Sequence, residues 1–306
     1  MTTGASTAQP AGAAAESHEK TANRLLKSSS RNSYDPLLDI DWDAEAPPGM
    51  TYLPPECVSL FGTELWERMS AEQRRDLSRH ELASFASTGL WFETMLLQMM
   101  ARYVYDQDPQ AAHTQYALTE IGDETRHIIM FAKAIARLKC PTYRPHPLVD
   151  ALARVYKATC SGVNLFAPVL VAEEVTDRLQ RSMMQDETVD PTIRMVNRIH
   201  VIEEARHVRF AREEVARLRK GSGPVRGFLD AISSAIVAAI IVSSLLNPAV
   251  YEAVGLDRKE AIRQARRNPH FHRSRRMLGE KVMAFLTEQG LITWSSRPVY
   301  RLVHLI

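Results

Sequence analysis

The sequence predicts an all-α fold, and both its composition and its hydrophobic periodicity support that prediction. Of 306 residues, 45% are hydrophobic, whereas only 13 are glycine and 16 are proline. The abundant leucine, alanine, methionine, arginine and glutamate favour helices over a turn-rich β architecture. Apolar residues recur with helical spacing over long stretches, and no run of residues alternates convincingly as a strand does. A chain of this length can bury a large core without disulfide bonds.

Helices are predicted wherever this periodicity continues between turn signals. The predicted helices cover residues 63–78, 80–105, 112–138, 148–186, 190–219, 225–246, 257–267 and 270–287. Turn-forming residues, such as the Gly-Ser-Gly-Pro run at 221–224, separate them. Pro168 lies inside the fourth pattern, which therefore forms either a kinked helix or two helices. Residues 35–55 contain several prolines, and we expect them to wrap the surface before the first helix.

The N-terminal residues differ in composition from the rest of the chain. Residues 1–33 are rich in Ala, Thr and Ser, and we expect them to be disordered, with residues 34–306 forming a single helical domain. They lack the continuous apolar core of a secretory signal. Cys57, Cys140 and Cys160 are far apart, so neither a disulfide framework nor a thiolate zinc site is indicated. A reducing cytoplasm fits this cysteine usage.

The charge pattern argues against large polyanionic partners. The formal net charge of +2 is spread over both signs, so neither a nucleic-acid nor a membrane partner is indicated. The most apolar stretch, residues 231–249, is uncharged, but its length is at the lower limit for a membrane span and it carries four serines. We therefore favour a buried bundle helix or a dimer-interface helix over a membrane span, and we expect a homodimer.

Two isolated glutamates lie inside apolar helical patterns. Glu93 is the only charged residue between Glu81 and Arg102, and Glu173 follows an uncharged stretch over residues 158–172. Burying an unpaired carboxylate is costly, so both glutamates, if buried, need a cation nearby. A narrow solvent face or an arginine partner would explain a single such glutamate equally well.

A repeated motif changes that balance. Glu-x-x-His occurs at 124–127 and again at 204–207, and this spacing places both side chains on one face of a helix. The glutamate of each motif lies 31 residues after an isolated glutamate, Glu93 or Glu173, so the first set maps onto the second at a shift of 80. Such a separation suits two antiparallel helices with a short connection, so two helix pairs would surround one centre. Di-iron and di-manganese carboxylate bundles have this arrangement.

The shift of 80 also distinguishes between two adjacent glutamates. Glu173 and Glu174 point about 100° apart around a helix, and the register selects Glu173. We interpret Glu174 as a residue outside the ligand set. Asp177, one turn beyond Glu173, could orient a ligating imidazole, although a solvated side chain is the simpler interpretation.

His200 adds a third histidine to the pattern. It lies four residues before Glu204 and seven before His207, on the same helical stripe, and we assign it as a seventh ligand. The matching position in the first half is Glu120, which a strictly symmetric site could also use. We do not assign it as a ligand, because an ordinary solvated residue is the simpler interpretation. Four carboxylates offset most of the charge of two metal ions, and imidazoles favour iron over magnesium or calcium. These ligand types suit manganese as well, so manganese is not excluded.

The chain resembles the p-aminobenzoate N-oxygenase family of ferritin-like diiron oxygenases over residues 60–291. The family pattern of Glu, Glu-x-x-His, Glu and His-x-x-x-Glu-x-x-His is met here by Glu93, Glu124, His127, Glu173, His200, Glu204 and His207. The third histidine separates it from ribonucleotide reductase small subunits and acyl desaturases. The resemblance implies a ferritin-like four-helix bundle core with additional helices, two iron ions (Fe2+/Fe3+) held by these seven residues, and dioxygen as co-substrate.

The resemblance also implies an activity. Members of the family oxidise a primary amine, typically an arylamine, to the hydroxylamine and often to the nitro compound in natural-product biosynthesis such as that of antibiotics, with electrons from an external donor. They can hold a substrate carboxylate with a C-terminal arginine. The candidate arginines here are Arg273, Arg275 and Arg276, beside His270 and His272. A solvated helix face is the simpler interpretation of this basic cluster.

The substrate pocket is not marked in the sequence, and other functions stay open. Six aromatic and methionine residues could line a pocket: Trp91, Phe92, Phe166, Met95, Met99 and Met100. A position in the hydrophobic core is the simpler interpretation of each. The same centre could support C–H hydroxylation or desaturation, because fold and metal do not fix the substrate. A ferritin-like storage protein or a radical-generating subunit is a further alternative. Tyr103 and Tyr105 lie more than two turns beyond Glu93, which disfavours the radical role.

Overall fold

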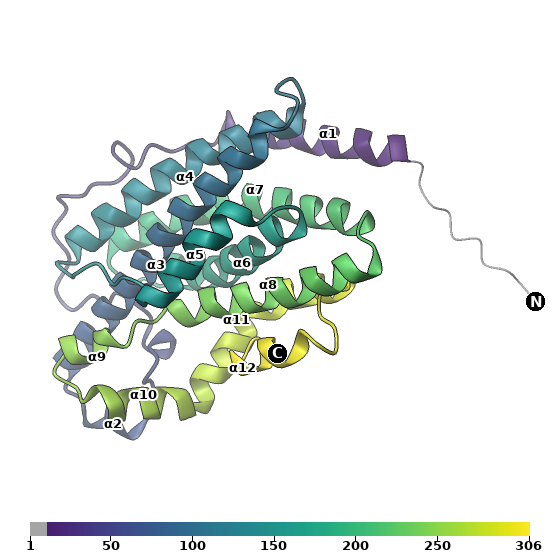
Figure 1. The fold of residues 1–306 in the computed structure, drawn as a ribbon. Coiled ribbons are helices and arrows are strands. Elements are labelled where there is room, and N and C mark those ends of the chain that lie inside the picture. The colour runs from purple at the N-terminus through teal and green to yellow at the C-terminus, as the bar shows by residue number, and fades with distance from the viewer. Residues whose placement is uncertain (1–10) are drawn as a thin grey trace, which may run out of the picture.

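The computed structural model describes the backbone of residues 11–306 and the side chains of residues 16–306 (Figure 1). These residues form helices and connecting segments, with no strand longer than an isolated bridge between Thr51 and Val189. The helices are α1 (Ala11–Ser29), the 3-10 helix Pro55–Cys57, α2 (Glu64–Arg68), α3 (Ala71–Tyr105), α4 (Ala112–Arg137), α5 (Pro147–Thr159), α6 (Val163–Gln185), α7 (Pro191–Lys220), α8 (Pro224–Ser244), α9 (Ala249–Ala253), α10 (Arg258–Arg267), α11 (Pro269–Glu288) and α12 (Arg297–Leu302).

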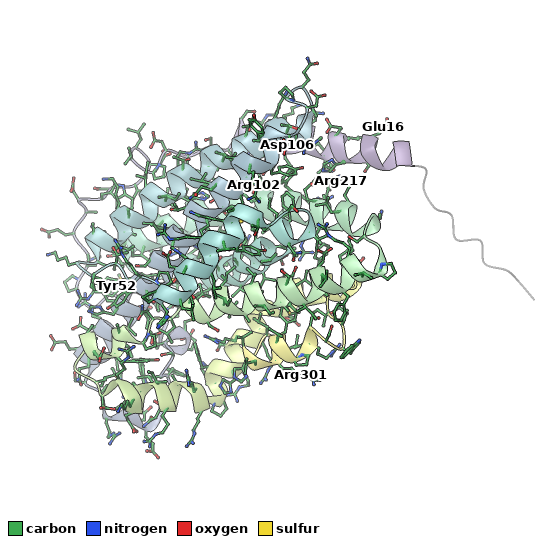
Figure 2. The ribbon with its side chains drawn as sticks, in the orientation of Figure 1. Glu16, Tyr52, Arg102, Asp106, Arg217 and Arg301 are labelled. Carbon is green, nitrogen blue, oxygen red and sulfur yellow. The ribbon has the colours of Figure 1, made fainter. Side chains whose placement is uncertain are left out.

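Four long helices form the centre of the fold. The short connections at 106–111 and 186–190 make α3 and α4 one antiparallel pair and α6 and α7 another, and α4 also packs against α7 (Figure 1). The predicted all-α fold, with a four-helix bundle core and additional helices, is confirmed. Charged side chains of both signs, such as Glu16, Asp106 and Arg301, cover the outside (Figure 2).

Local sequence fixes the ends of these helices. Ser70 and Gln73 form a capping box at the start of α3, so the chain breaks there rather than near residue 79 as predicted. At the start of α7, the side chain of Asp190 accepts a hydrogen bond from the backbone N–H of Ile193, and Pro191 occupies the first turn, where its missing N–H costs nothing.

The predicted helix over 148–186 is two helices, and the break lies before Pro168. Gly162 has a φ of 62°, a left-handed conformation that glycine adopts without strain, and it separates α5 from α6. Pro168 lies within α6, where it has no N–H to donate to the carbonyl of Asn164. That carbonyl instead accepts a hydrogen bond from the hydroxyl of Tyr156 on α5. The proline therefore costs the helix little.

The expected N-terminal disorder is wrong for residues 11–29, which form α1 against α4 and α7. Ala22 and Leu25 of α1 are buried in the main core. The carboxylate of Glu19 accepts a hydrogen bond from the backbone N–H of Ala112, 2.6 Å away, at the start of α4. Composition alone therefore concealed an amphipathic helix. Residues 1–10 of the predicted segment lie outside the described residues, and a single domain over 34–306 stays a prediction.

The apolar stretch predicted as a bundle helix is α8. Ala235, Ala238 and Val242 are buried on its inner face, and the helix packs against α6 and α12. Within the described residues, only the stretch 224–253 is long and apolar enough to cross a membrane, and 39% of its most apolar window is buried. A helix that packs against a protein core passes the same criterion. Phe228 and Ile236 are exposed on the outer face, and homodimer formation through it stays a prediction.

Candidate metal centre

The seven residues singled out in the sequence lie together in the middle of the bundle. They come from α3 (Glu93), α4 (Glu124 and His127), α6 (Glu173) and α7 (His200, Glu204 and His207). Each is at most 4% exposed. Their carboxylate oxygens and imidazole nitrogens form overlapping groups of three in which the atoms lie within 4.8 Å of one another. The structure therefore brings together all seven predicted residues.

Two glutamates occupy the middle of this cluster. Nδ1 of His127 lies 3.4 Å from Oε2 of Glu124 and 3.3 Å from Oε1 of Glu204. Nδ1 of His207 lies 3.1 Å from Oε1 of Glu124 and 3.0 Å from Oε1 of Glu204. Each of the two carboxylates thus faces both imidazoles, as a carboxylate that bridges two metal ions must.

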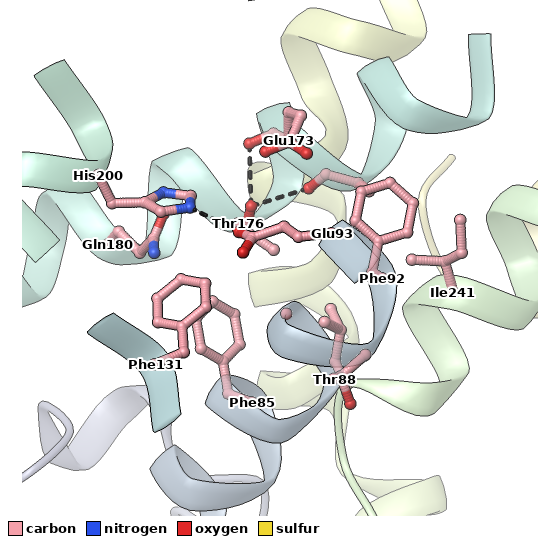
Figure 3. A pocket seen from close by; sticks show the side chains of 13 residues that line it. Phe85, Thr88, Phe92, Glu93, Phe131, Glu173, Thr176, Gln180, His200 and Ile241 are labelled. Atoms are coloured by element: carbon pink, nitrogen blue, oxygen red, sulfur yellow. Dashed lines mark hydrogen bonds and ion pairs between the residues drawn. The ribbon is translucent and has the colours of Figure 1, made fainter. Parts of the chain in front are cut away.

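The third histidine faces the same centre. Nε2 of His200 lies 3.1 Å from Oε1 of Glu93 and 3.7 Å from Oε1 of Glu204. Its ring centroid is 4.5 Å from that of His127. Burial lowers the pKa of His200 to about 4, so the ring is neutral at neutral pH, which is the form that binds metals. Figure 3 shows His200, Glu93 and Glu173 around one pocket.

The donor set fits bound cations. Glu93 Oε2 and Glu204 Oε2 are buried without a hydrogen-bond partner among the described residues. Burial and the neighbouring carboxylate of Glu124 raise the pKa of Glu93 well above its usual range, and burial with Glu204 does the same for Glu173. The negative charges of these buried carboxylates repel one another. Two bound metal ions would offset this repulsion and would also bind the oxygens that have no hydrogen-bond partner.

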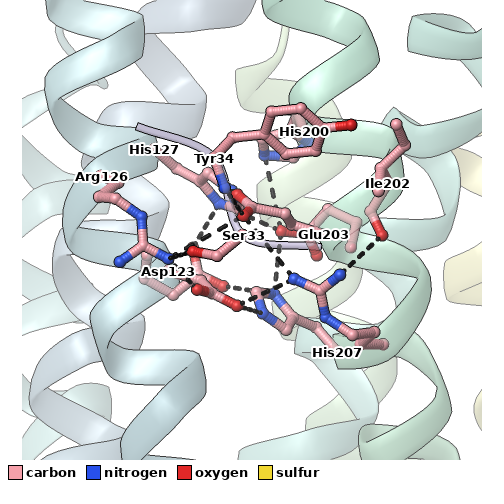
Figure 4. Close-up of polar contacts among 12 residues, drawn as sticks. Ser33, Tyr34, Asp123, Arg126, His127, His200, Ile202, Glu203 and His207 are labelled. Atoms are coloured by element: carbon pink, nitrogen blue, oxygen red, sulfur yellow. Dashed lines mark hydrogen bonds and ion pairs between the residues drawn. The ribbon is translucent and has the colours of Figure 1, made fainter. Parts of the chain in front are cut away.

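Two carboxylates that were not predicted from the sequence contact the imidazoles on the side that faces away from the centre. Glu203 Oε2 lies 2.8 Å from Nε2 of His127, and Asp123 Oδ2 lies 3.2 Å from Nε2 of His207. Each carboxylate therefore reaches the histidine of the other helix (Figure 4). An Nε2–H that donates to a carboxylate leaves Nδ1 free to accept, and Nδ1 is the atom that faces the centre.

Arginines and the N-terminal segment complete this network. Nη2 of Arg206 lies 3.4 Å from Oδ2 of Asp123 and 3.7 Å from Oε1 of Glu203. Arg126, one turn after Asp123 on α4, also bonds to Asp123. The backbone N–H of Tyr34 donates to Glu203 over 3.2 Å, so the N-terminal segment closes this side (Figure 4). The sequence does contain a signal for Asp123 and Glu203. The pattern Asp/Glu-Glu-x-Arg-His occurs in both halves of the chain, at the shift of 80.

The two residues weighed as neighbours of Glu173 lie away from the centre. Glu174 binds the guanidinium of Arg212 through two contacts of 2.7 Å, which agrees with the choice of Glu173 by register. Asp177 accepts a hydrogen bond of 2.7 Å from Arg181 and, among the described residues, makes none with an imidazole. Its side chain is not solvated as expected, because it is only 20% exposed and its Oδ1 atom is buried.

Glu120 is not the solvated residue that the sequence analysis expected. Its side chain is buried at 3% exposure, and one of its oxygens lies in a group with Glu124 and His207. Burial and the carboxylate of Glu124 raise its pKa to about 8, against the lowering effect of His207.

A small cavity adjoins the centre on the side of α3 and α6. It has a volume of about 20 Å³, and Phe85, Phe92 and Phe131 form much of its wall (Figure 3). A larger cavity of about 440 Å³ shares Phe85 and Leu245 with it and lies between α3, α6, α8 and α11.

The candidate pocket residues from the sequence divide between these cavities and the core. Trp91, Met95 and Met99 line a separate cavity of about 350 Å³ beneath α5, which also touches Phe92. Phe166 and Met100 are core residues. Of the C-terminal basic residues, those that line the 440 Å³ cavity are His270, Arg273 and Arg275.

The chain is similar in sequence to mycobacterial proteins. The uncharacterized proteins Rv0885 of Mycobacterium tuberculosis (strain ATCC 25618 / H37Rv) and Mb0909 of Mycobacterium bovis (strain ATCC BAA-935 / AF2122/97) are each 27% identical over 201 residues, or 62% of this chain. The match spans 58% of the length of these relatives.

Solved structures of R2-like ligand-binding oxidase variants with a Mn/Fe cofactor superpose with a TM-score of 0.45 at 10% and 11% identity, over 94% of this chain and 89% and 91% of theirs. The family model described as p-aminobenzoate N-oxygenase AurF matches residues 15–290. The chain therefore belongs to the AurF family of p-aminobenzoate N-oxygenases.

Proposed function

We propose that this protein binds two iron ions between α3, α4, α6 and α7 and uses dioxygen to oxidise the nitrogen of a primary amine, most simply an arylamine. The observation that carries the proposal is the position of His200, which lies against both Glu93 and His127 in a centre that already has a matched Glu and Glu-x-x-His set. Membership in the AurF family supports the reaction class.

The geometry suggests how the ligands would divide between the ions. Glu124 and Glu204 face both His127 and His207, so they would bridge the ions. The terminal ligands would be Glu93, Glu173, His127, His200 and His207. Iron bound there would supply the redox chemistry that activates dioxygen. The same oxygen and nitrogen donors accept manganese, and metal analysis of the purified protein distinguishes the two.

The proposed reaction has a defined balance. An amine R–NH2, dioxygen, two electrons and two protons give the hydroxylamine R–NHOH and water, so an external electron donor is part of the proposal. One N–H bond is replaced by N–O–H, and the second oxygen atom leaves as water. Phe85, Phe92 and Phe131 would exclude bulk water from the side of the centre next to Glu93.

The larger cavity suggests the substrate class. Arg275 lines it, stacks over Phe271 at 4.7 Å and has no ion-pair partner among residues 16–306. A partly buried guanidinium without a carboxylate is well suited to bind one from a ligand. We therefore propose that the substrate is an arylamine that carries a carboxylate. This molecule would reach the centre between Phe85 and Leu245.

The test is turnover by the full chain loaded anaerobically with Fe(II) and then given reductant, 18O2 and an aminobenzoate. The expected product carries 18O on nitrogen, and the protein binds two iron ions per chain. The matched control is the hydroxybenzoate of the same ring position, which offers no nitrogen. Oxygen inserted into a C–H bond instead would favour the hydroxylase alternative and overturn N-oxygenation. Uptake of oxygen with no oxidised amine would also overturn it.

A further inference from the structure

Glu120 stands apart from the other buried carboxylates outside the predicted ligand set. Its Oε2 atom is buried without a hydrogen-bond partner among the described residues, as are oxygens of Glu93 and Glu204. The remaining buried carboxylates have partners: Glu81 binds Ser59, Glu174 binds Arg212, Glu214 binds Arg217, Asp190 binds the N–H of Ile193, Asp230 binds Asn164, and Asp123 and Glu203 bind the histidines. Glu120 thus shares the signature of the proposed ligands.

The internal repeat gives Glu120 a counterpart. At the shift of 80 it corresponds to His200, just as His127 corresponds to His207. His200 lies in a group with Glu93 and His127, whereas Glu120 lies in a group with Glu124 and His207. The two side chains therefore occupy equivalent places on opposite sides of the centre, each beside the imidazole of the other helix.

The neighbour of Glu120 on α4 has an unmade interaction as well. Tyr116, one turn earlier, is fully buried, and its hydroxyl has no partner among the described residues. No arginine or lysine forms an ion pair with Glu120 in residues 16–306. A buried carboxylate without a donor or a cation is costly, and a metal ion or a water bound to one would satisfy it.

We infer that Glu120 is an eighth ligand of the centre, the carboxylate counterpart of the imidazole of His200. The inference rests on the proposed dimetal site and extends it. The ion beside His200 then has two histidines, whereas the ion beside Glu120 has His207 and an additional oxygen donor. The centre is therefore asymmetric, with a nitrogen-rich and an oxygen-rich side, and the oxygen-rich side suits the harder ion.

The test is anaerobic titration of the full-length metal-free protein with Co(II), followed by its visible absorption and by competition with a chelator. The wild type is expected to bind two equivalents. Glu120→Gln, which keeps the shape and removes the charge, should weaken one equivalent by at least about tenfold and change the Co(II) absorption. Glu120→His should restore tight binding, because it places the counterpart of His200 in the first half.

The outcomes separate this inference from the proposed function. If the wild type binds fewer than two equivalents, the dimetal site itself is wrong. If the wild type binds two and Glu120→Gln and Glu120→Ala both bind two with unchanged affinity and absorption, only the role of Glu120 is overturned. Glu174→Gln, a buried glutamate held by Arg212 away from the centre, is the matched control and should leave binding unchanged. Circular dichroism verifies that each variant is folded.

Discussion

His127 on α4 and Glu203 on α7 are joined across the bundle by a contact of 2.8 Å between Nε2 and Oε2. The contact fixes the ring so that Nδ1 faces Glu124 and Glu204. Because a carboxylate behind an imidazole also raises its basicity, Glu203→Gln should lower metal affinity by about 10–100-fold while the metal stoichiometry is kept. Chelator competition measures this change.

The control for this prediction lies on the same helix. Glu213 pairs with Arg209 near the surface, and Glu213→Gln should leave metal affinity unchanged. Equal affinities for Glu203→Gln and the wild type would show that Glu203 does not support the ligand.

The adjacent pair Glu173 and Glu174 tests the register directly. Glu173→Gln should reduce bound iron well below that of the wild type, because this carboxylate lies in the ligand cluster. Glu174→Gln should keep the iron and lower the free energy of unfolding by about 1 kcal/mol, because it weakens the partly exposed pair with Arg212. Metal analysis and denaturant unfolding of both variants suffice. The reverse pattern would refute the choice of Glu173.

The sequence predicted the seven clustered residues because charge inside an apolar helix and a repeated spacing are visible without a structure. Glu203 was missed, and Glu120 was weighed but not assigned, because a glutamate at the edge of a helical stripe looks the same whether it is solvated or covered. What covers the α4 and α7 face is α1 and the segment after it, which contacts Glu203 through Tyr34. Since residues 1–33 were expected to be disordered, the burial of this face could not be foreseen.

Helix breaks follow the same logic. Pro168 is conspicuous in the sequence, yet the helix continues through it, because the Tyr156 hydroxyl donates to the carbonyl that the proline leaves free. The chain breaks earlier, at Gly162, which has a positive φ. That hydroxyl comes from a separate helix, so local propensity carries no information about it.

Glu81 should make stability depend on pH. Burial raises its pKa to about 7 from 4.5, although hydrogen bonds from Ser59 lower it. The folded state therefore holds this proton more tightly than the unfolded state. The stabilisation is complete below about pH 4.5 and is lost as the pH rises through about 7, a change of about 3 kcal/mol.

Glu81→Gln isolates this contribution from that of the metal centre. Metal-free wild type and variant are unfolded with denaturant across pH 4.5 to 8, and the difference between their free energies of unfolding is plotted. The wild type should lose stability relative to the variant as the pH rises. Glu67→Gln, at an exposed position, should show no such slope. A pH-independent difference for Glu81→Gln would contradict the raised pKa.

Arg275 should bind the carboxylate of the substrate. The guanidinium lines the 440 Å³ cavity without an acidic partner among residues 16–306. A charged hydrogen bond contributes about 1.5–3 kcal/mol, so Arg275→Met should lower kcat/KM for an aminobenzoate by about 10–100-fold. An uncharged aniline makes no such bond, and its kcat/KM should change little. Arg276→Met, at the adjacent exposed position, controls for the lost charge. An equal loss for both substrates would mean that Arg275 supports the cavity wall and does not bind the carboxylate.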